Sequence, residues 1–117
     1  YLEENVNKYI ENGLFFDEEL KGIDGIEIIK YHDKTKPSYW LYTAIIDRRD
    51  DFIEYMKSNG VMCSPLHLRN DRHSIFEDGY HLSGLASLYS RFIHWGCGWW
   101  LSQEDRIKIV DLIKKGW

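Results

Sequence analysis

The chain has 117 residues, of which 44% are hydrophobic and 29% charged, and these proportions fit one folded domain and exclude a disordered chain. Nineteen acidic residues against fifteen basic ones give a net charge of −4, which argues against a nucleic-acid-binding protein. The apolar runs fall far short of the roughly 20 residues that cross a bilayer, so no membrane span is expected, and two cysteines are too few for a disulfide scaffold.

The N-terminal half begins with a helical pattern and continues with two strand patterns. Apolar residues at steps of three and four predict an amphipathic helix over residues 2–20, which Gly13 weakens by about 1 kcal/mol and could interrupt. Two glycines then mark a turn, and the β-branched run 26–31 predicts a first strand. The almost continuous apolar run 38–47 predicts a central strand buried on both faces, with Trp40 packed inside.

A helix and a short strand are expected next. Asp47 is placed to cap the free amides of a helix that carries Phe52 and Met56 on its buried side, and Gly60 stands just after its end. Residues 61–64 then read as a strand. Strand, helix and strand together predict a βαβ-like unit.

The C-terminal half contains a long polar segment followed by a helix, a strand and a helix. Residues 65–84 have no clear period, and a loop of this length inside a compact domain is usually functional or disordered. Helical spacing from Leu85 to Phe92 precedes a short strand over 92–95, whose tryptophan is expected to be buried. Ser102 opens a Ser-x-x-Asp capping pattern that predicts a last helix to about Lys115.

This order of elements predicts an α+β fold, with a small sheet of about three to four strands backed by helices. No repeat, low-complexity tract or linker divides the sequence, so residues 1–117 are predicted to be a single domain. The first residue is Tyr1 rather than Met, and we therefore expect a fragment of a longer protein. Since no secretory leader is visible, the expected location is the cytoplasm.

The long polar segment concentrates side chains that bind anions or move protons. These are His67, Arg69, Asn70, Asp71, Arg72, His73 and Ser74. A zinc site built from Cys63, His67 and His73, even with His81 or Cys97 added, matches no compact zinc spacing and is disfavoured. Cys63 with His67 could form a nucleophilic pair, but a thiol in an apolar strand is more often inert. The residues alone thus indicate a site-forming loop without a complete catalytic set.

Five segments, taken in order, carry a resemblance to a known family. They are Asn5-x3-Tyr9, Ser38-Tyr39-Trp40-Leu41-Tyr42, Arg48-Arg49-Asp50-x-Phe52, Gly60-Val61-Met62-Cys63-Ser64-Pro65-Leu66-His67 and Cys97-Gly98-Trp99-Trp100-Leu101-Ser102-x2-Asp105. The set resembles the C-terminal part of the DegT/DnrJ-type sugar aminotransferases, over nearly the whole chain. The resemblance implies the small α+β domain of a fold type I enzyme dependent on pyridoxal phosphate (PLP). Residues 1–20 would then be the helix leading out of the large domain, and 21–117 the small domain.

The resemblance also implies the roles of the polar segment. In that family the small domain closes over PLP held by an N-terminal large domain, and a His-containing loop faces the nucleotide-sugar substrate. Substrate-binding roles, through charge-assisted hydrogen bonds to phosphate or sugar hydroxyls, are implied for His67, Arg69, Asn70, Arg72 and His73. His67 matches the first His of the family. Leu68 stands where the family often has Tyr, and His73 comes six residues after His67 instead of five.

The reaction implied is amino transfer to a keto-sugar by PLP bound to a lysine. That lysine lies in the large domain, so no catalytic or cofactor-binding residue is expected here, none of the nine lysines is a candidate, and the isolated chain should be inactive. The expected partners are the missing large domain, a nucleotide sugar and a second copy in a homodimer. The alternative is a free-standing module that senses a small ligand or binds another protein.

Overall fold

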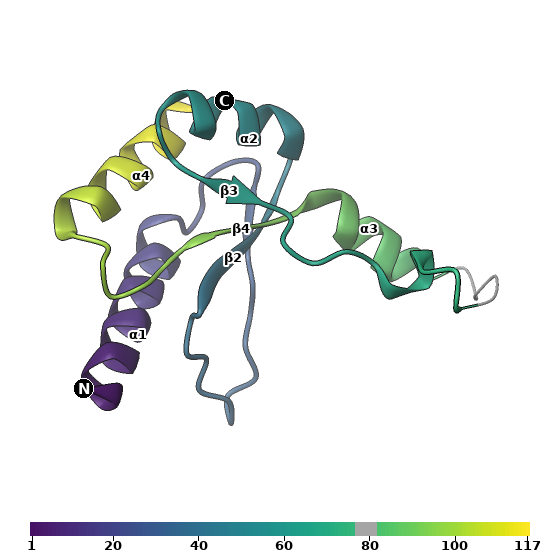
Figure 1. The fold of residues 1–117 in the computed structure, drawn as a ribbon. Helices are drawn as coiled ribbons and strands as arrows, with labels where there is room; N and C mark the ends of the chain where they lie inside the picture. Colours follow the sequence, from purple (N-terminus) through teal and green to yellow (C-terminus); the bar gives the residue numbers. More distant parts are fainter. Residues whose placement is uncertain (77–81) are drawn as a thin grey trace.

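The computed structural model describes residues 1–76 and 82–117, and within these parts helices pack on an antiparallel sheet (Figure 1). The helices are α1 (Leu2–Glu19), α2 (Arg49–Ser58), the 3₁₀ turn η1 (Asn70–Arg72), α3 (Ser83–Arg91) and α4 (Gln103–Lys115). The strands are β1 (Ile26–Ile28), β2 (Leu41–Ile46), β3 (Cys63–Ser64) and β4 (Phe92–Gly96), in the spatial order β1-β2-β4-β3. The predicted α+β class and the predicted order of elements are confirmed.

The sheet is built around β4, which lies between two strands that precede it in the sequence. Both β2 and β3 pair antiparallel with β4, so β2 and β3 run in the same direction. The unit β2-α2-β3 is therefore a crossover between strands of one direction, with β4 inserted between them. The predicted βαβ-like unit has the correct strand direction, but its two strands are not neighbours.

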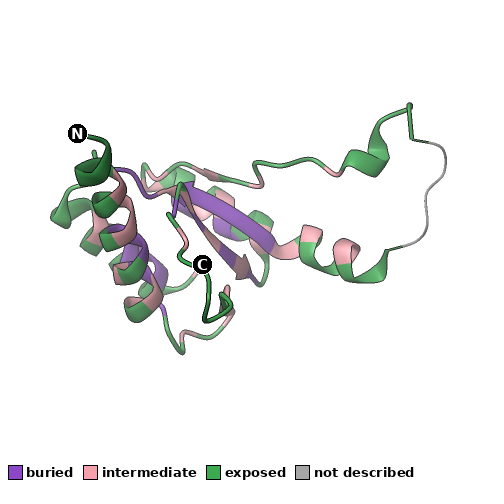
Figure 2. Cartoon of the chain, turned by 90° about the horizontal axis from the view of Figure 1, so that it is seen from below, coloured by how far each residue is buried: buried purple, intermediate pink, exposed green. Residues whose placement is uncertain are grey.

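The core lies between one face of the sheet and helices α1, α2 and α4 (Figures 1 and 2). Register explains the composition of this face, because Tyr42 stands opposite Trp95 and Ala44 opposite Ile93 in the β2–β4 pair. Their side chains are buried together with residues from the three helices and with Leu20, which caps the end of α1: Phe16, Leu20, Phe52, Met56, Ile109, Val110, Leu112 and Ile113. The buried position expected for the tryptophan of β4 is thus confirmed.

Gly13 does not interrupt α1, which is continuous over 18 residues. The aromatic ring of Tyr39 occupies the space beside this glycine, so that a Cβ at position 13 would lie 2.1 Å from Tyr39 Cγ. The hydroxyl of Tyr39 donates to Asp17 at 2.5 Å, and that of Tyr42 donates to the same carboxylate at 2.8 Å. Gly13 therefore makes room for a tyrosine that is tied to the next turn of the helix.

The entry to β2 differs from the prediction. Tyr39 has a positive φ of 50°, and the chain bends there before the strand begins at Leu41. Trp40 is left outside the strand with 63% of its surface exposed, so its predicted burial is wrong. Within β2 half-buried and buried residues alternate, which means that only one face of the strand is fully buried instead of two. On β1, the strand ends at Ile28, short of the predicted 31.

The two helix starts expected from polar residues have different outcomes. At α4, Ser102 Oγ accepts from the amide of Asp105, and the Asp105 carboxylate accepts from the amide of Ser102, both at 3.1 Å, so the predicted capping box is confirmed. At α2, the N-cap is Arg48 with a left-handed φ of 49° and no side-chain cap. The predicted N-cap Asp47 instead accepts from Arg91 at 2.7 Å, because the end of α3 brings that guanidinium to it.

One part of the chain projects away from the sheet and its helices (Figures 1 and 2). We call residues 67–76 together with α3 the arm. The arm explains why the radius of gyration is 15.6 Å, when a compact chain of this length is expected near ~13 Å. In the described residues, no helix has the length and apolar character needed to cross a membrane.

Candidate functional site

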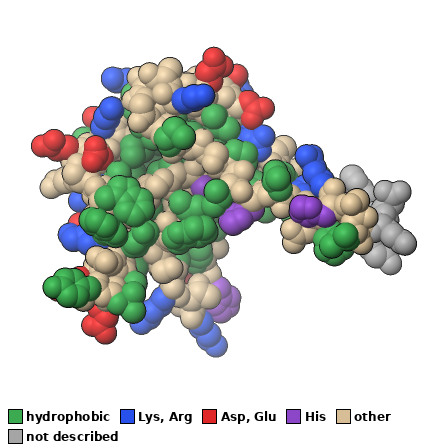
Figure 3. Space-filling model, viewed as in Figure 1, with side chains coloured by type: hydrophobic (Ala, Val, Ile, Leu, Met, Phe, Trp, Pro, Cys, Tyr) green, Lys and Arg blue, Asp and Glu red, His purple; other side chains and the backbone are tan. Residues whose placement is uncertain are grey.

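The sheet has a second face, directed away from α1, α2 and α4. Strand alternation and register place on it six residues from three neighbouring strands: Leu41, Thr43, Ile45, Ser64, Phe92 and His94. None of these residues belongs to the core cluster on the other face, although Phe92 and His94 are themselves buried. The space-filling view shows hydrophobic side chains over the front of the molecule, with histidines beside them toward the arm (Figure 3). The second face is therefore the surface from which the arm departs.

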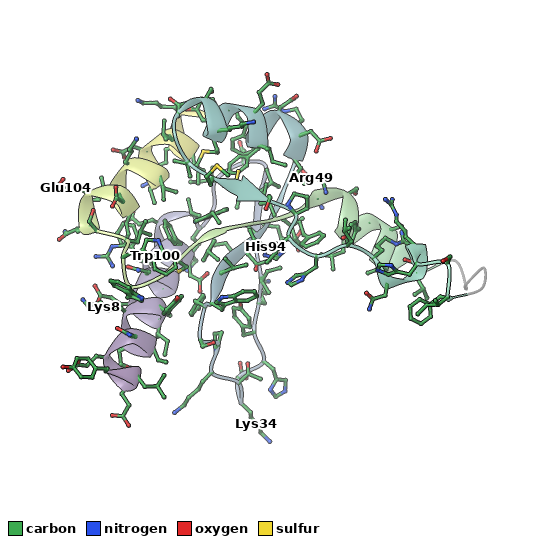
Figure 4. The ribbon with its side chains drawn as sticks, in the orientation of Figure 1. Lys8, Lys34, Arg49, His94, Trp100 and Glu104 are labelled. Atoms are coloured by element: carbon green, nitrogen blue, oxygen red, sulfur yellow. The ribbon has the colours of Figure 1, made fainter. Side chains whose placement is uncertain are left out.

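A group of aromatic and imidazole rings lies where the arm meets the sheet. We call the rings of Trp40, His67 and His94 the root of the arm. The rings of His67 and His94 meet edge to face, with centroids 5.5 Å apart and an interplanar angle of 80°. The ring of Trp40 also lies near His67, with the two ring centroids 6.4 Å apart. Figure 4 shows His94 on β4 near the middle of the sheet, where the body meets the arm. The exposed Trp40 and His67 thus form the outer layer of this group, and His94 the inner one.

His94 is a buried imidazole with one satisfied nitrogen. Only 8% of the residue is exposed, and its Nδ1 lies 2.8 Å from Thr43 Oγ1. Its Nε2 is buried and has no hydrogen-bond partner within the described parts of the chain. Burial lowers the pKa of His94 below the ordinary value of 6.5, and the neighbouring charge of His67 lowers it further. The sheet therefore holds this imidazole in its neutral form.

The stability of the fold should therefore depend on pH near neutrality. Because the pKa of His94 is lower in the folded than in the unfolded chain, the unfolded chain binds more protons below pH 6.5, and stability falls as the pH drops through that value. We expect a lower melting temperature at pH 5.5 than at pH 7.5. In His94→Asn, whose amide replaces Nδ1 toward Thr43, the difference should shrink, while His32→Asn on an exposed connection should keep it. Equal pH dependence in wild type and His94→Asn would contradict the prediction.

The other predicted site residues lie farther out on the arm. Arg69 donates to both carboxylate oxygens of Asp71, through Nε at 2.9 Å and through Nη2. This pairing lowers the pKa of Asp71, because the guanidinium stabilises its charged form. Asn70, Arg72 and His73 are exposed on and just after η1. In the described residues no hydrogen bond or ring contact joins these four residues to His67. The structure therefore places the predicted site residues in two groups, with His67 at the root and the other four farther along the arm.

Arg72 is a second guanidinium on the arm, and it is exposed. Within the described part of the chain its side chain makes no ion pair, whereas the guanidinium of Arg69 is already engaged by Asp71. Both guanidiniums act on the carboxylate of Asp71, Arg69 through hydrogen bonds and Arg72 through its charge. A guanidinium can offer two parallel donors to such an anion.

Two adjoining cavities lie where β3 and β4 meet. One of about 130 Å³ lies at this edge of the sheet and is lined by residues of both faces: Leu41, Met62, Cys63, Ser64, Leu66, His94, Trp95 and Gly96. The other, of about 220 Å³, extends toward α4 and shares Met62, Trp95 and Gly96 with the first. No Lys or Arg lines the smaller cavity, so it offers neutral and apolar groups instead of charge to a ligand.

The zinc ligands that the sequence offered can be compared with the described residues. Residues 1–76 and 82–117 contain no group of three or more His, Cys, Asp or Glu side chains that could hold an ion. His81, which the sequence offered as an additional ligand, lies outside the described residues. Burial raises the pKa of Cys63 to about 11 and that of Cys97 to about 12, so both thiols are protonated at neutral pH. The inert state predicted for Cys63 follows from this desolvation.

Thiol labelling tests that state. Because a pKa of about 11 leaves little thiolate at pH 7.5, we expect Cys63 to react with a disulfide reagent about 100-fold more slowly in the folded chain than in guanidinium chloride. A Cys97→Ala variant isolates the signal of Cys63. Labelling of the folded variant at the rate of a free cysteine would show an activated thiol and contradict the prediction.

A PLP Schiff base requires a lysine in a desolvated pocket. All nine lysines of this chain are exposed, and Lys34, for example, points away from the body at the tip of the β1–β2 connection (Figure 4). These exposed lysines are therefore not suited to form the Schiff base with PLP.

The sequence did not reveal His94, Thr43 or the exposed position of Trp40 as features of the site. The signal for His94 was the alternation in Phe92-Ile93-His94-Trp95, which places it opposite the buried face of β4.

Comparison with known proteins gives matches among solved structures alone. No protein-family model matches the chain, and no curated protein does. The sugar aminotransferase CalS13 from Micromonospora echinospora is similar at 35% identity and a TM-score of 0.96, covering 100% of this chain and 32% of that one. AtS13 from Actinomadura melliaura is similar at 33% identity and a TM-score of 0.95, with the same coverage of both chains. A DegT DnrJ EryC1 StrS aminotransferase from Brucella abortus shares the fold at 18% identity and a TM-score of 0.85. The match covers 97% of this chain and 31% of that one.

The chain thus spans about a third of the length of these proteins. The part that it matches is a C-terminal piece.

Proposed function

Since this chain belongs to the DegT/DnrJ-type sugar aminotransferases and corresponds to their C-terminal small domain, we propose that it closes the PLP site of a nucleotide-sugar aminotransferase. The observation that carries the proposal is the match to CalS13, which extends over the entire chain at 35% identity. At that level the likeness goes beyond a shared small-domain topology. The catalytic lysine and the groups that bind PLP belong, in this proposal, to the N-terminal two thirds of the parent protein.

The arm and the root contribute to substrate binding in different ways. We assign Arg72 to the diphosphate of the nucleotide sugar, because it is an exposed guanidinium without an ion-pair partner in the described residues. Arg69 and Asn70 support it from the same turn, and His73 follows directly. His67 lies apart, between Trp40 and the second face of the sheet, where an aromatic surface suits a sugar ring or a base.

Docking of the chain onto its large domain is supported by the apolar surface around the second face. Several large side chains there are exposed, including Trp40 at 63% and Met62 at 80%. Burial of such side chains against a neighbouring domain would remove apolar surface from water. The homodimer and the cytoplasmic location remain predictions, and sedimentation of the intact parent protein would test the first.

A domain exchange tests the proposed function. The C-terminal third of CalS13 would be replaced by these 117 residues, and the purified chimera would be tested for bound PLP and for amino transfer to a nucleotide-linked keto-sugar. We expect PLP absorbance that responds to the sugar nucleotide. In the chimera, Arg72→Ala should raise the KM for that substrate about 10-fold to 100-fold through loss of charged hydrogen bonds. Lys57→Ala, an exposed change at the end of α2, should not.

A folded chimera that binds PLP but never responds to a nucleotide sugar would overturn the proposal. Tight binding of a small ligand by the isolated 117-residue chain would favour the alternative of a free-standing sensing module.

A further inference from the structure

We propose that His94 is a positioning residue, which holds the ring of His67, and with it the root of the arm, against the second face of the sheet and releases both when the histidine pair takes up a proton. The contact is a property of this chain, and its consequence for substrate binding rests on the proposed function. His94 would thus make the candidate site dependent on pH.

The two rings differ in how firmly they are held. His94 is fixed on three sides: by its strand, by Thr43 Oγ1 at 2.8 Å from Nδ1, and by the ring of Phe92 at 5.0 Å. His67 is exposed and lies in a stretch without helix or strand. When the pair separates, His67 is therefore the partner that moves, and the residues that follow it move with it.

The unsatisfied nitrogen of His94 explains why the contact favours neutral rings. Its Nε2 is buried and without a hydrogen-bond partner in the described residues, and His67 meets the ring edge to face at 5.5 Å. An edge-to-face pair lets an N–H of one ring contact the π face of the other, which is a weak but favourable interaction. A second proton on the ring of His94 replaces this contact by a buried positive charge, which costs free energy unless an acidic group is near.

Among the residues that the structure describes, no such acid faces His94. Thr43 faces His94 from β2, Ser64 from β3 and Phe92 from β4, and all three are uncharged. Among the described residues His67 alone acts on the pKa of His94 by its charge, and it acts in the same direction as burial. Glu27 of β1 is on the same face, opposite Ile45, but it pairs with Arg91 at 3.8 Å. A positive charge on His94 is therefore left without compensation.

Nuclear magnetic resonance of the 117-residue chain tests the contact without a partner domain. Imidazole and backbone signals would be followed between pH 5 and 8 in the wild type, in His94→Asn and in the control His32→Asn. We expect the backbone signals of residues 65–69 to shift with pH in the wild type and in the control. In His94→Asn, which keeps a polar group toward Thr43, these signals should stay at their acid-state positions throughout.

Unchanged signals of residues 65–69 at pH 7.5 in a folded His94→Asn variant would overturn the proposal. So would independent titration of the two imidazoles in the wild type. A His67→Asn variant gives a second measurement, since removing the charge of His67 should raise the pKa of His94.

The CalS13 chimera separates this inference from the proposed function. If both hold, the KM for the nucleotide sugar rises as the pH falls below about 6.5, and His94→Asn removes that dependence while leaving PLP bound. An active chimera whose KM has the same pH profile with and without His94 would contradict the positioning role alone. An inactive chimera together with the expected magnetic resonance shifts would contradict the proposed function alone.

Discussion

Gly13→Ala is expected to destabilise the chain, although the same change stabilises most helices. Alanine should improve helix propensity by about 1 kcal/mol. Its Cβ, however, would lie 2.1 Å from Cγ of Tyr39. That ring cannot retreat freely, because its hydroxyl is bound to Asp17 and its plane stacks on Tyr42 at 6.4 Å. Overpacking of this kind costs about 1–3 kcal/mol, and more where a backbone must shift, so we expect a net loss of ~2 kcal/mol.

The matched control is Gly84→Ala in α3. Among residues 1–76 and 82–117, a Cβ at position 84 would meet nothing within 4 Å, so this substitution should stabilise the chain by up to about 1 kcal/mol. Thermal unfolding would show the two variants on opposite sides of the wild type, with Gly13→Ala lower by roughly 5–10 °C. If Gly13→Ala melts at or above the wild-type temperature, the close contact with Tyr39 is not a constraint on the fold.

Asn12→Ala should cause a large loss of stability, although the residue is polar. The side chain is 2% exposed and connects three segments of the chain. Its amide nitrogen donates to the carbonyls of Cys97 at 3.2 Å and Gly98 at 2.8 Å. Its carbonyl oxygen accepts from Arg106 on α4 at 3.1 Å. Alanine leaves these groups unpaired, at about 1–3 kcal/mol each when buried, so we expect a total loss of ~3–5 kcal/mol.

Such a loss is a large share of the roughly 5–15 kcal/mol that stabilises a typical domain. The control is Asn5→Ala on the exposed side of the same helix, which should change stability by no more than about 0.5 kcal/mol. Urea unfolding would measure both, with the slope m compared to confirm that the unfolded states are alike. Similar midpoints for the two variants would mean that the bonds of Asn12 contribute little.

Local patterns in the sequence were sufficient for most of the fold. The capping box of Ser102 and Asp105 could be predicted because its two partners are three residues apart. Asn12 and Gly13 could not be interpreted in the same way. Periodicity put Asn12 on the polar side of the helix, and only the distant segments around Tyr39 and Cys97 give the two residues their roles. Asp47 failed as a cap for the same reason, since Arg91 reaches it from another helix.

The candidate site was predictable in composition but not in geometry. The polar segment stood out because its residue types bind anions, and His67, Arg69 and Arg72 all belong to it. The sequence could not show that His67 lies apart from Arg69 and Arg72, because nothing in the order of residues indicates that His67 contacts His94 on β4. His94 was hidden within an apolar strand pattern. Its partner lies across the sheet, and strand register depends on tertiary pairing.

The insertion of β4 between β2 and β3 has a consequence for how the chain is made. A ribosome delivers both flanking strands before the one that joins them, and until Gly96 has emerged the nascent polypeptide carries unpaired strand edges. Such edges favour premature association between neighbouring nascent chains. If translation paused before Phe92, the nascent chain would thus be exposed to aggregation, and it would depend on chaperones until β4 had been made.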